Sequence, residues 1–177
     1  MNDAGEHVIL VDIDDRETGH AAKLPAHRQG QMHRAISVSI VDPRGRMLLQ
    51  RRARDKYHSG GLWTNACCTH PRRGEAVNDA AERRLFEELG VSCPLHWVLR
   101  THYRAEVGDL IENEVVHLFH GNYVGEVRPD PSEVDAFVWT PRETLLRDME
   151  THPDDYTYWF KYYMRNFADR LFLGAAA

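Results

Sequence analysis

Two pairs of charged residues have a spacing that brings their side chains together for chemistry. Arg84 and Glu88 are four residues apart in a segment of helix-forming composition, so both lie on one face of the expected helix. An arginine there donates to phosphate oxygens, and a glutamate binds divalent cations. Glu112 and Glu114 are two residues apart in a segment typical of a strand, which points both carboxylates to one face. Both patterns favour a site for a small anionic ligand and a metal ion.

The helical segment belongs to a longer pattern that covers residues 69–91. This stretch resembles the Nudix box, G-x5-E-x7-R-E-U-x-E-E-x-G-U, in which U is apolar. The matching residues are Glu75, Arg83, Leu85, Glu87, Glu88, Gly90 and Val91. Thr69 replaces the first glycine, and Arg84 replaces the first helical glutamate. Nudix hydrolases use such carboxylates to gather metal ions around a diphosphate that water attacks. Because Arg84 removes one carboxylate, we expect Mg²⁺-diphosphate binding with poor hydrolysis.

Two further segments narrow the resemblance. Upstream lies Trp63-Thr64-Asn65-Ala66-Cys67-Cys68-Thr69-His70-Pro71, and downstream lies Glu112-Asn113-Glu114. Together they are similar to the two signatures of type I isopentenyl-diphosphate isomerases, and the similarity extends over nearly the whole chain. It implies an α/β (α+β) fold of the Nudix type, with a mixed sheet flanked by helices. It also implies interconversion of isopentenyl and dimethylallyl diphosphate for isoprenoid biosynthesis.

Carried over residue by residue, the resemblance implies two metal sites and a diphosphate site. One buried Mn²⁺ or Zn²⁺ would be bound by His27, His33, His70, Glu112 and Glu114. Imidazole and carboxylate ligands together suit Mn²⁺, Zn²⁺ or Fe²⁺. Mg²⁺ would accompany the substrate, bound by Glu88 and by the backbone carbonyl of Cys68. The diphosphate would be bound by Lys23, Arg52, Lys56 and Arg84. The remaining histidines, His58 among them, match no motif and are interpreted as structural residues.

The isomerisation needs an acid and a base, because one carbon gains a proton and another loses one. The resemblance assigns these roles to Cys68 and Glu114, on opposite faces of the substrate. It assigns Tyr103 to the Glu114 carboxyl and Trp159 to the developing cation. A tryptophan face contributes about 1 to 2 kcal/mol to a desolvated cation, which is a partial share of the barrier reduction.

The expected elements place these residues in a single domain that spans residues 1–177. We expect strands at 7–12, 96–103, 114–123 and 136–139, and a hairpin of 35–41 and 47–51 around a turn at 42–45. We expect helices at 78–89, ended by Gly90, and at about 156–173. A capping box at 140–143, with Pro141 at the first helical position, predicts another helix start. Residues 1–34 would contribute metal and diphosphate ligands, and residues 174–177 would be frayed.

Composition limits the partners and the compartment. The formal net charge of −5 argues against a nucleic-acid binder, because such proteins neutralise many phosphates with a basic surface. The acidic N-terminal stretch resembles neither a signal peptide nor a membrane span. Three cysteines, two of them adjacent, favour a reducing cytoplasm. We therefore expect a cytoplasmic monomer or homodimer that acts on a small prenyl diphosphate away from membranes.

Two other functions remain compatible with the Nudix pattern. The first is a Nudix hydrolase that cleaves a diphosphate, which an intact glutamate at position 84 would have favoured. The second is a binding module that recognises a diphosphate without turnover. Loss of the acid, the base or the metal ligands would favour the second, and these residues are present in the sequence.

Overall fold

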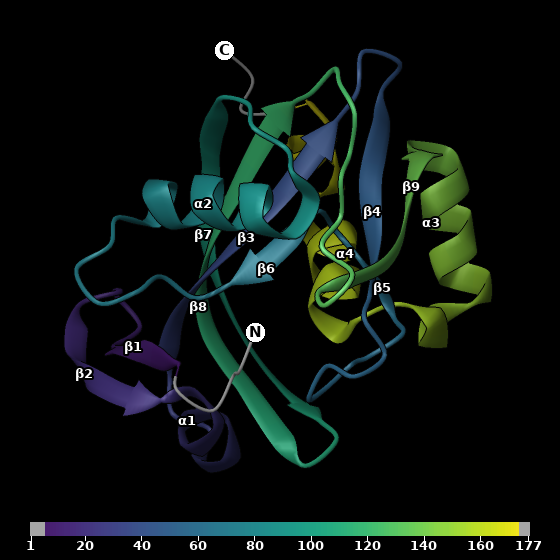
Figure 1. The fold of residues 1–177 in the computed structure, drawn as a ribbon. Helices are drawn as coiled ribbons and strands as arrows, with labels where there is room; N and C mark the ends of the chain where they lie inside the picture. The colour runs from purple at the N-terminus through teal and green to yellow at the C-terminus, as the bar shows by residue number, and fades with distance from the viewer. Residues whose placement is uncertain (1–5, 174–177) are drawn as a thin grey trace.

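The computed structural model describes residues 6–173 and, within that range, contains one mixed sheet of nine strands (Figure 1). The strands are β1 His7–Val11, β2 Glu17–Ala22, β3 His33–Val41, β4 Arg46–Arg52, β5 Trp63–Thr64, β6 Cys67–Thr69, β7 Leu95–Val107, β8 Leu110–Asn122 and β9 Val134–Pro141. The helices are α1 Lys23–Gln29, α2 Val77–Leu89, α3 Arg142–Thr151 and α4 Tyr158–Leu173, with a 3₁₀ turn, η2, at Pro153–Asp155.

Strand β3 is the centre of the sheet. It pairs in parallel with β8, from His33 opposite Glu114 to Val41 opposite Asn122. Short β6 pairs antiparallel with β3 from its other side, which places Cys68 opposite Ser37. Long β7 pairs antiparallel with β8, while β9 and β5 pair antiparallel with β4. The registers bring the N-terminal part of β3, the Glu112 to Glu114 stretch of β8 and β6 to the same region.

The two faces of the sheet are covered by different helices, which gives an α+β fold of one domain. Strand β8 shows the alternation: Leu118 packs into the core with α3 and α4, whereas Phe119 packs into the core with α2. Both side chains are almost fully buried. Helix α2 crosses its face of the sheet in Figure 1, with α4 on the other face. In residues 6–173, no helix is both long enough and apolar enough to cross a bilayer.

Several predicted elements are confirmed. Helix α2 begins one residue before the predicted start and ends at Leu89. Gly90 follows it in the left-handed region with φ 63°, and its N–H donates to the carbonyl of Phe86 at 2.8 Å. The predicted hairpin is β3 and β4, and Asp42 accepts the backbone N–H groups of Arg44 and Arg46 in its turn. The strands predicted at 96–103 and 136–139 lie within β7 and β9, and the strand predicted at 114–123 matches β8 up to Asn122.

Other expectations were wrong or incomplete. The predicted helix start is confirmed, because α3 begins at Arg142, but its details were wrong. Thr140 does not cap the helix, because it is paired with Met47 in β9, and Pro141 is the extended residue before α3. Strand pairing outweighs the capping pattern there. The last helix begins at Tyr158 rather than at Tyr156 and departs from helical geometry at Phe167. Strand β2 and helix α1 were not predicted. The predicted fraying at 174–177 lies outside the described residues.

Candidate active site

A cavity that is partly open to solvent lies where the two long strands β7 and β8 meet α2, α4 and the segment between β4 and β5. Most of the predicted site residues line it: Lys23, Arg52, Lys56, Cys68, His70, Arg84, Glu88, Tyr103, Glu112, Glu114 and Trp159. His27 and His33 lie beside it, against His70, with ring centroids 5.4 and 4.9 Å from that ring. The structure therefore brings together every residue that the resemblance implied.

The sheet itself positions the His and Glu cluster. His33 is the register partner of Glu114 across the parallel pair β3 and β8, and Tyr103 is the partner of Glu114 across β7 and β8. His33 Nε2 lies 3.4 Å from Glu114 Oε1, and His70 Nε2 lies 3.0 Å from the same oxygen. Three adjacent strands thus present one row of side chains around a single carboxylate.

Backbone carbonyls set the orientation of two of the histidines. Nδ1 of His27 lies 2.8 Å from the carbonyl of Lys23, and Nδ1 of His33 lies 2.8 Å from the carbonyl of Gln31. Because a carbonyl only accepts, both Nδ1 atoms carry the proton. Each Nε2 is buried without a hydrogen-bond partner, as is Nδ1 of His70. Buried imidazole nitrogens facing carboxylates, with the far nitrogen held by a carbonyl, fit a divalent cation.

The ligand atoms fall into two overlapping groups that share His27. His27, His33, His70 and Glu114 each offer one atom within 4.8 Å of the others, and so do His27, His58 and Glu112. Gly30 ends α1 between His27 and His33, with φ 61° and Ile111 side-chain atoms 3.1 Å from where a Cβ would lie. A larger residue there would push α1 from β8, so this glycine helps to place both histidines.

Burial and neighbouring charges shift the pKa values of the histidines and of Glu114 in this cluster. Burial lowers the pKa of His70 well below its usual range, and burial together with His33 lowers the pKa of His27. Burial also acts to lower the pKa of His33, but the nearby carboxylate of Glu114 outweighs burial and raises the pKa. Conversely, burial acts to raise the pKa of Glu114, but His33 lowers it to about 2. The carboxylate is therefore held as an anion that attracts a cation.

Cys68 is positioned by two buried polar residues. Its Sγ lies 3.2 Å from Ser37 Oγ, its neighbour across β3 and β6, and 3.2 Å from Asn65 Oδ1. Asn65 is fully buried and donates through Nδ2 to Ser37 Oγ and to the carbonyl of Val38. Burial raises the pKa of the Cys68 thiol to about 12. Ser37 and Asn65 thus fix the direction in which the sulfur points.

Tyr103 and Trp159 take fixed positions in the wall of the cavity. The Tyr103 hydroxyl donates to Glu114 Oε2 at 2.8 Å and lies 3.4 Å from Glu112 Oε2. Burial, with the charges of Glu114 and Glu112, raises the pKa of Tyr103 well above its usual range, so it acts as a donor. Trp159 Nε1 donates to Thr64 Oγ1 at 2.9 Å, and the Arg52 guanidinium lies 5.3 Å from the ring centroid. This ring therefore accepts a cation at its face.

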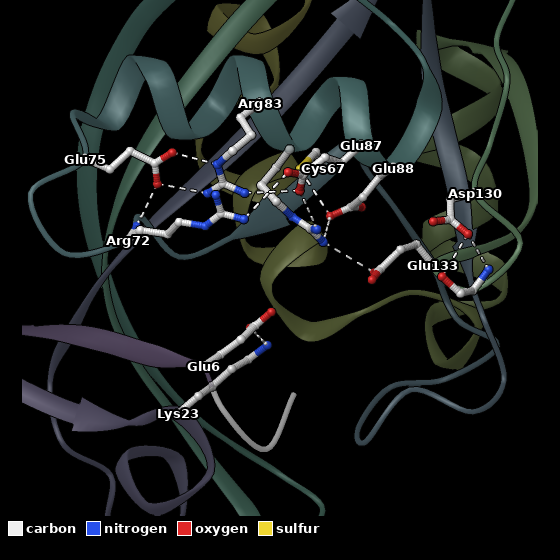
Figure 2. A network of polar contacts seen from close by, with 12 residues as sticks. Glu6, Lys23, Cys67, Arg72, Glu75, Arg83, Glu87, Glu88, Asp130 and Glu133 are labelled. Atoms are coloured by element: carbon white, nitrogen blue, oxygen red, sulfur yellow. Dashed lines mark hydrogen bonds and ion pairs between the residues drawn. The ribbon is translucent and has the colours of Figure 1, made fainter. Parts of the chain in front are cut away.

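Three of the basic residues of the cavity, Lys23, Lys56 and Arg84, are paired with carboxylates, whereas Arg52 contacts the backbone carbonyl of His58. Arg84 binds Glu88 at 2.7 Å and Glu87 at 2.9 Å, and lies 3.4 Å from Glu133. Lys56 Nζ binds Glu133 Oε2 at 2.7 Å. Figure 2 shows Glu88 and Glu133 within one network, and the pair of Lys23 with Glu6, at 2.9 Å, as a separate contact. A bound diphosphate would compete with these carboxylates for the same basic side chains.

The comparisons with known proteins identify the family. The NUDIX domain family matches residues 31–160. An isopentenyl-diphosphate Delta-isomerase from Burkholderia multivorans is 51% identical over 88% of this chain and 89% of its own length. Another, from Serratia proteamaculans, is 46% identical over 91% of this chain and 90% of its own length. The chain belongs to the isopentenyl-diphosphate Delta-isomerase family.

Solved structures with little sequence similarity support the fold assignment of this family member. DR0079 from Deinococcus radiodurans is 16% identical and has a TM-score of 0.76, covering 92% of this chain and 99% of its own. A MutT protein from Methanosarcina mazei has a TM-score of 0.65 at 16% identity, over 78% of this chain and 94% of its own. These structures show a shared Nudix fold.

Sequence reasoning missed several residues that shape the site. His58 and Glu133 line the cavity, and each contacts a residue with a predicted role. Gln50 is buried on β4 and donates to Glu88 Oε2 at 2.8 Å, which fixes that carboxylate. Ser37 lies in β3, a strand of mostly apolar residues. Ser37 and Gln50 could have been found as polar residues within the buried strands β3 and β4. His58 and Glu133 lie in loops, where no sequence pattern marks them.

Proposed function

We propose that this family member interconverts isopentenyl and dimethylallyl diphosphate by proton transfer between carbon atoms. The single observation that supports this reaction best is that the Cys68 thiol and the Glu114 carboxylate line one cavity with a row of basic side chains. The relatives named for this reaction cover almost the same length of chain. A small prenyl diphosphate fits such a cavity, with its charged end at the cations and its apolar end at Trp159.

Cys68 and Glu114 carry the two proton transfers. One adds a proton to the terminal carbon of the alkene, which leaves a tertiary cation, and the other removes a proton from the carbon two positions away. Because the reaction is reversible, each group donates in one direction and accepts in the other. Tyr103 holds the Glu114 carboxylate by its 2.8 Å hydrogen bond. The Trp159 ring stabilises the positive charge in the same way that it holds Arg52.

The diphosphate end is held by Lys23, Arg52, Lys56 and Arg84, which give it charge-assisted hydrogen bonds. Glu88 and the Cys68 carbonyl hold the Mg²⁺ that accompanies the substrate. His27, His33, His70, Glu112 and Glu114 hold one Mn²⁺ or Zn²⁺, which their mixed nitrogen and oxygen donors suit. That ion supplies a fixed positive charge that orders the carboxylates. Residues 1–34 contribute part of this set, within one domain of 1–177.

We also propose that the protein works in the cytoplasm, as a monomer or homodimer, without nucleic acid or membrane partners. The three free cysteines support a reducing compartment. A Nudix hydrolase is the alternative function. The placement of Arg84 beside Glu88 argues against it, because it puts a cation where a hydrolase of this pattern would place a further metal-binding carboxylate.

The test is proton NMR of isopentenyl diphosphate with the protein, Mg²⁺ and Mn²⁺ in D₂O. We expect dimethylallyl diphosphate with incorporated deuterium from the wild type, and loss of turnover by at least about 10³-fold in Cys68→Ala and Glu114→Gln. Cys93→Ala, which removes a thiol that does not line the cavity, is the matched control and should keep full activity. Released phosphate with an unmoved double bond would instead show a hydrolase.

A further inference from the structure

His58 lies at the junction of two parts of the site, although it belongs to no motif. It is carried by the segment between β4 and β5, and its side chain is only 8% exposed. Nε2 lies 3.0 Å from Glu112 Oε1. Because a carboxylate oxygen only accepts, this close contact favours a proton on Nε2 that faces the oxygen. The other ring nitrogen lies 3.3 Å from Ser59 Oγ, so both ends of the imidazole have a partner.

The contact with His58 restricts which way Glu112 faces. With Oε1 against His58, Oε2 lies 4.0 Å from His27 Nε2 and 3.4 Å from the Tyr103 hydroxyl. His27 Nε2 is buried without a hydrogen-bond partner. When one oxygen of a carboxylate is held by a neighbour, the other oxygen points in a single direction. Neighbouring residues commonly orient metal ligands in this way. Glu112 thus depends on His58 for its orientation.

The same imidazole also contacts Trp159 in the wall of the cavity. Its ring stands edge-on to Trp159, with centroids 5.6 Å apart and planes at 89°. Arg52, whose guanidinium lies over that tryptophan, donates through Nη2 to the backbone carbonyl of His58 at 3.3 Å. Lys56, two residues earlier in the segment, binds Glu133. His58 therefore joins the diphosphate-binding side of the cavity to the His and Glu cluster.

We propose that His58 is a positioning residue, which orients Glu112 for metal binding through Nε2–H and locks the β4–β5 segment against Trp159. The part of this proposal that concerns isomerase turnover rests on the proposed function. The part that concerns the metal does not. Loss of the Nε2 donor frees the Glu112 carboxylate to rotate, and the metal site then has to order it on binding.

Two substitutions of His58 test the Nε2–H donor and the aromatic ring separately. His58→Phe keeps a flat ring for the edge contact with Trp159 but lacks the donor. His58→Gln keeps a donor near the position of Nε2 but lacks the ring. His102→Phe is the matched control, because His102 bonds Asn113, between the two glutamates, with its imidazole at 2.8 Å but does not line the cavity.

The first measurement is Zn²⁺ affinity of the whole chain, by competition with a chromophoric chelator and without substrate. We expect affinity to fall about 10- to 100-fold in His58→Phe, to be largely restored in His58→Gln, and to be unchanged in His102→Phe. Unchanged affinity in His58→Phe would overturn the proposal. A His58→Gln variant as weak as His58→Phe would overturn the donor role.

The second measurement separates positioning from direct metal binding. With saturating Co²⁺, the visible absorption spectrum of His58→Phe should match that of the wild type, because the ligands are the same. A changed spectrum would show that His58 is itself a ligand and would overturn the proposal. The turnover number should fall in His58→Phe, while KM for isopentenyl diphosphate changes little. If the wild type failed to isomerise, the proposed function would fail, while the affinity and spectral results would still decide the role of His58.

Discussion

Replacing Arg84 by methionine should destabilise the protein far more than the same change at Arg83, the preceding residue of α2. The Arg84 side chain is 9% exposed, and two of its partners, Glu88 and Glu133, are each 6% exposed. Methionine would leave these two carboxylates buried beside each other. Breaking a buried ion pair from one side costs about 3 to 5 kcal/mol, because the remaining charge stays desolvated. Arg83 binds the more exposed Glu75 and Glu87, so its loss should cost about 1 kcal/mol.

The assay is urea unfolding at pH 7 in the presence of a chelator, which prevents metal from neutralising Glu88. Adding Glu133→Gln to Arg84→Met should recover part of the loss, with a coupling energy of about 1 to 3 kcal/mol between the two positions. Glutamine still accepts a hydrogen bond from Lys56. If Arg84→Met cost no more than Arg83→Met, or if the two changes were additive, the reasoning from burial would be refuted.

Two further predictions concern the metal site and pH. Removal of divalent metal should speed amide exchange in residues 23–33, because His27 and His33 would lose the metal ion that they share. Exchange in α3, which is far from these ligands in sequence, should not change. Equal exchange rates in residues 23–33 with and without chelator would contradict this prediction. Hydrogen bonding by Arg83 lowers the pKa of Glu75 below its usual range. The ionised carboxylate therefore stabilises the fold at neutral pH, and this contribution is lost as the pH falls through the lowered pKa. Glu75→Gln should therefore lower the unfolding free energy by about 1 kcal/mol at pH 7 and by less in acid, and a pH-independent difference would argue otherwise.

The elements that sequence predicted are the ones with strong local patterns. Helix α2 has a helix-forming run followed by a glycine, and β3 and β4 flank a turn with Asp42 at its start. Helix α1 is also followed by a glycine, Gly30, but its sequence signal is weak. Its seven residues include Pro25, and its N-cap, Ala22, makes no side-chain hydrogen bond. Strands β5 and β6 have two and three residues, too few for a periodic pattern. Their pairing depends on distant neighbours.

The site residues that could be predicted are likewise those that lie within local sequence motifs. The resemblance located residues within recognisable motifs, such as Cys68 and Glu114, and the structure brings them to one cavity. Residues that act through a loop conformation or a long-range contact were missed. His58 meets Glu112, and Glu133 meets Lys56, only after the sheet has formed. No local pattern encodes such a meeting, because it depends on how segments far apart in the chain are placed.

The parallel register of β3 and β8 also sets an order of events when the chain is made. His33 and Glu114 are register partners, although almost half of the chain separates them. A growing chain that has not reached residue 112 carries its three cluster histidines without either glutamate. Parallel pairing of distant strands forms late, because the intervening segment must first be closed into a loop. A metal ion that needs these glutamates would therefore bind only after the sheet has assembled. A strand slipped by one residue would turn Glu114 to the opposite face and leave the histidines without it.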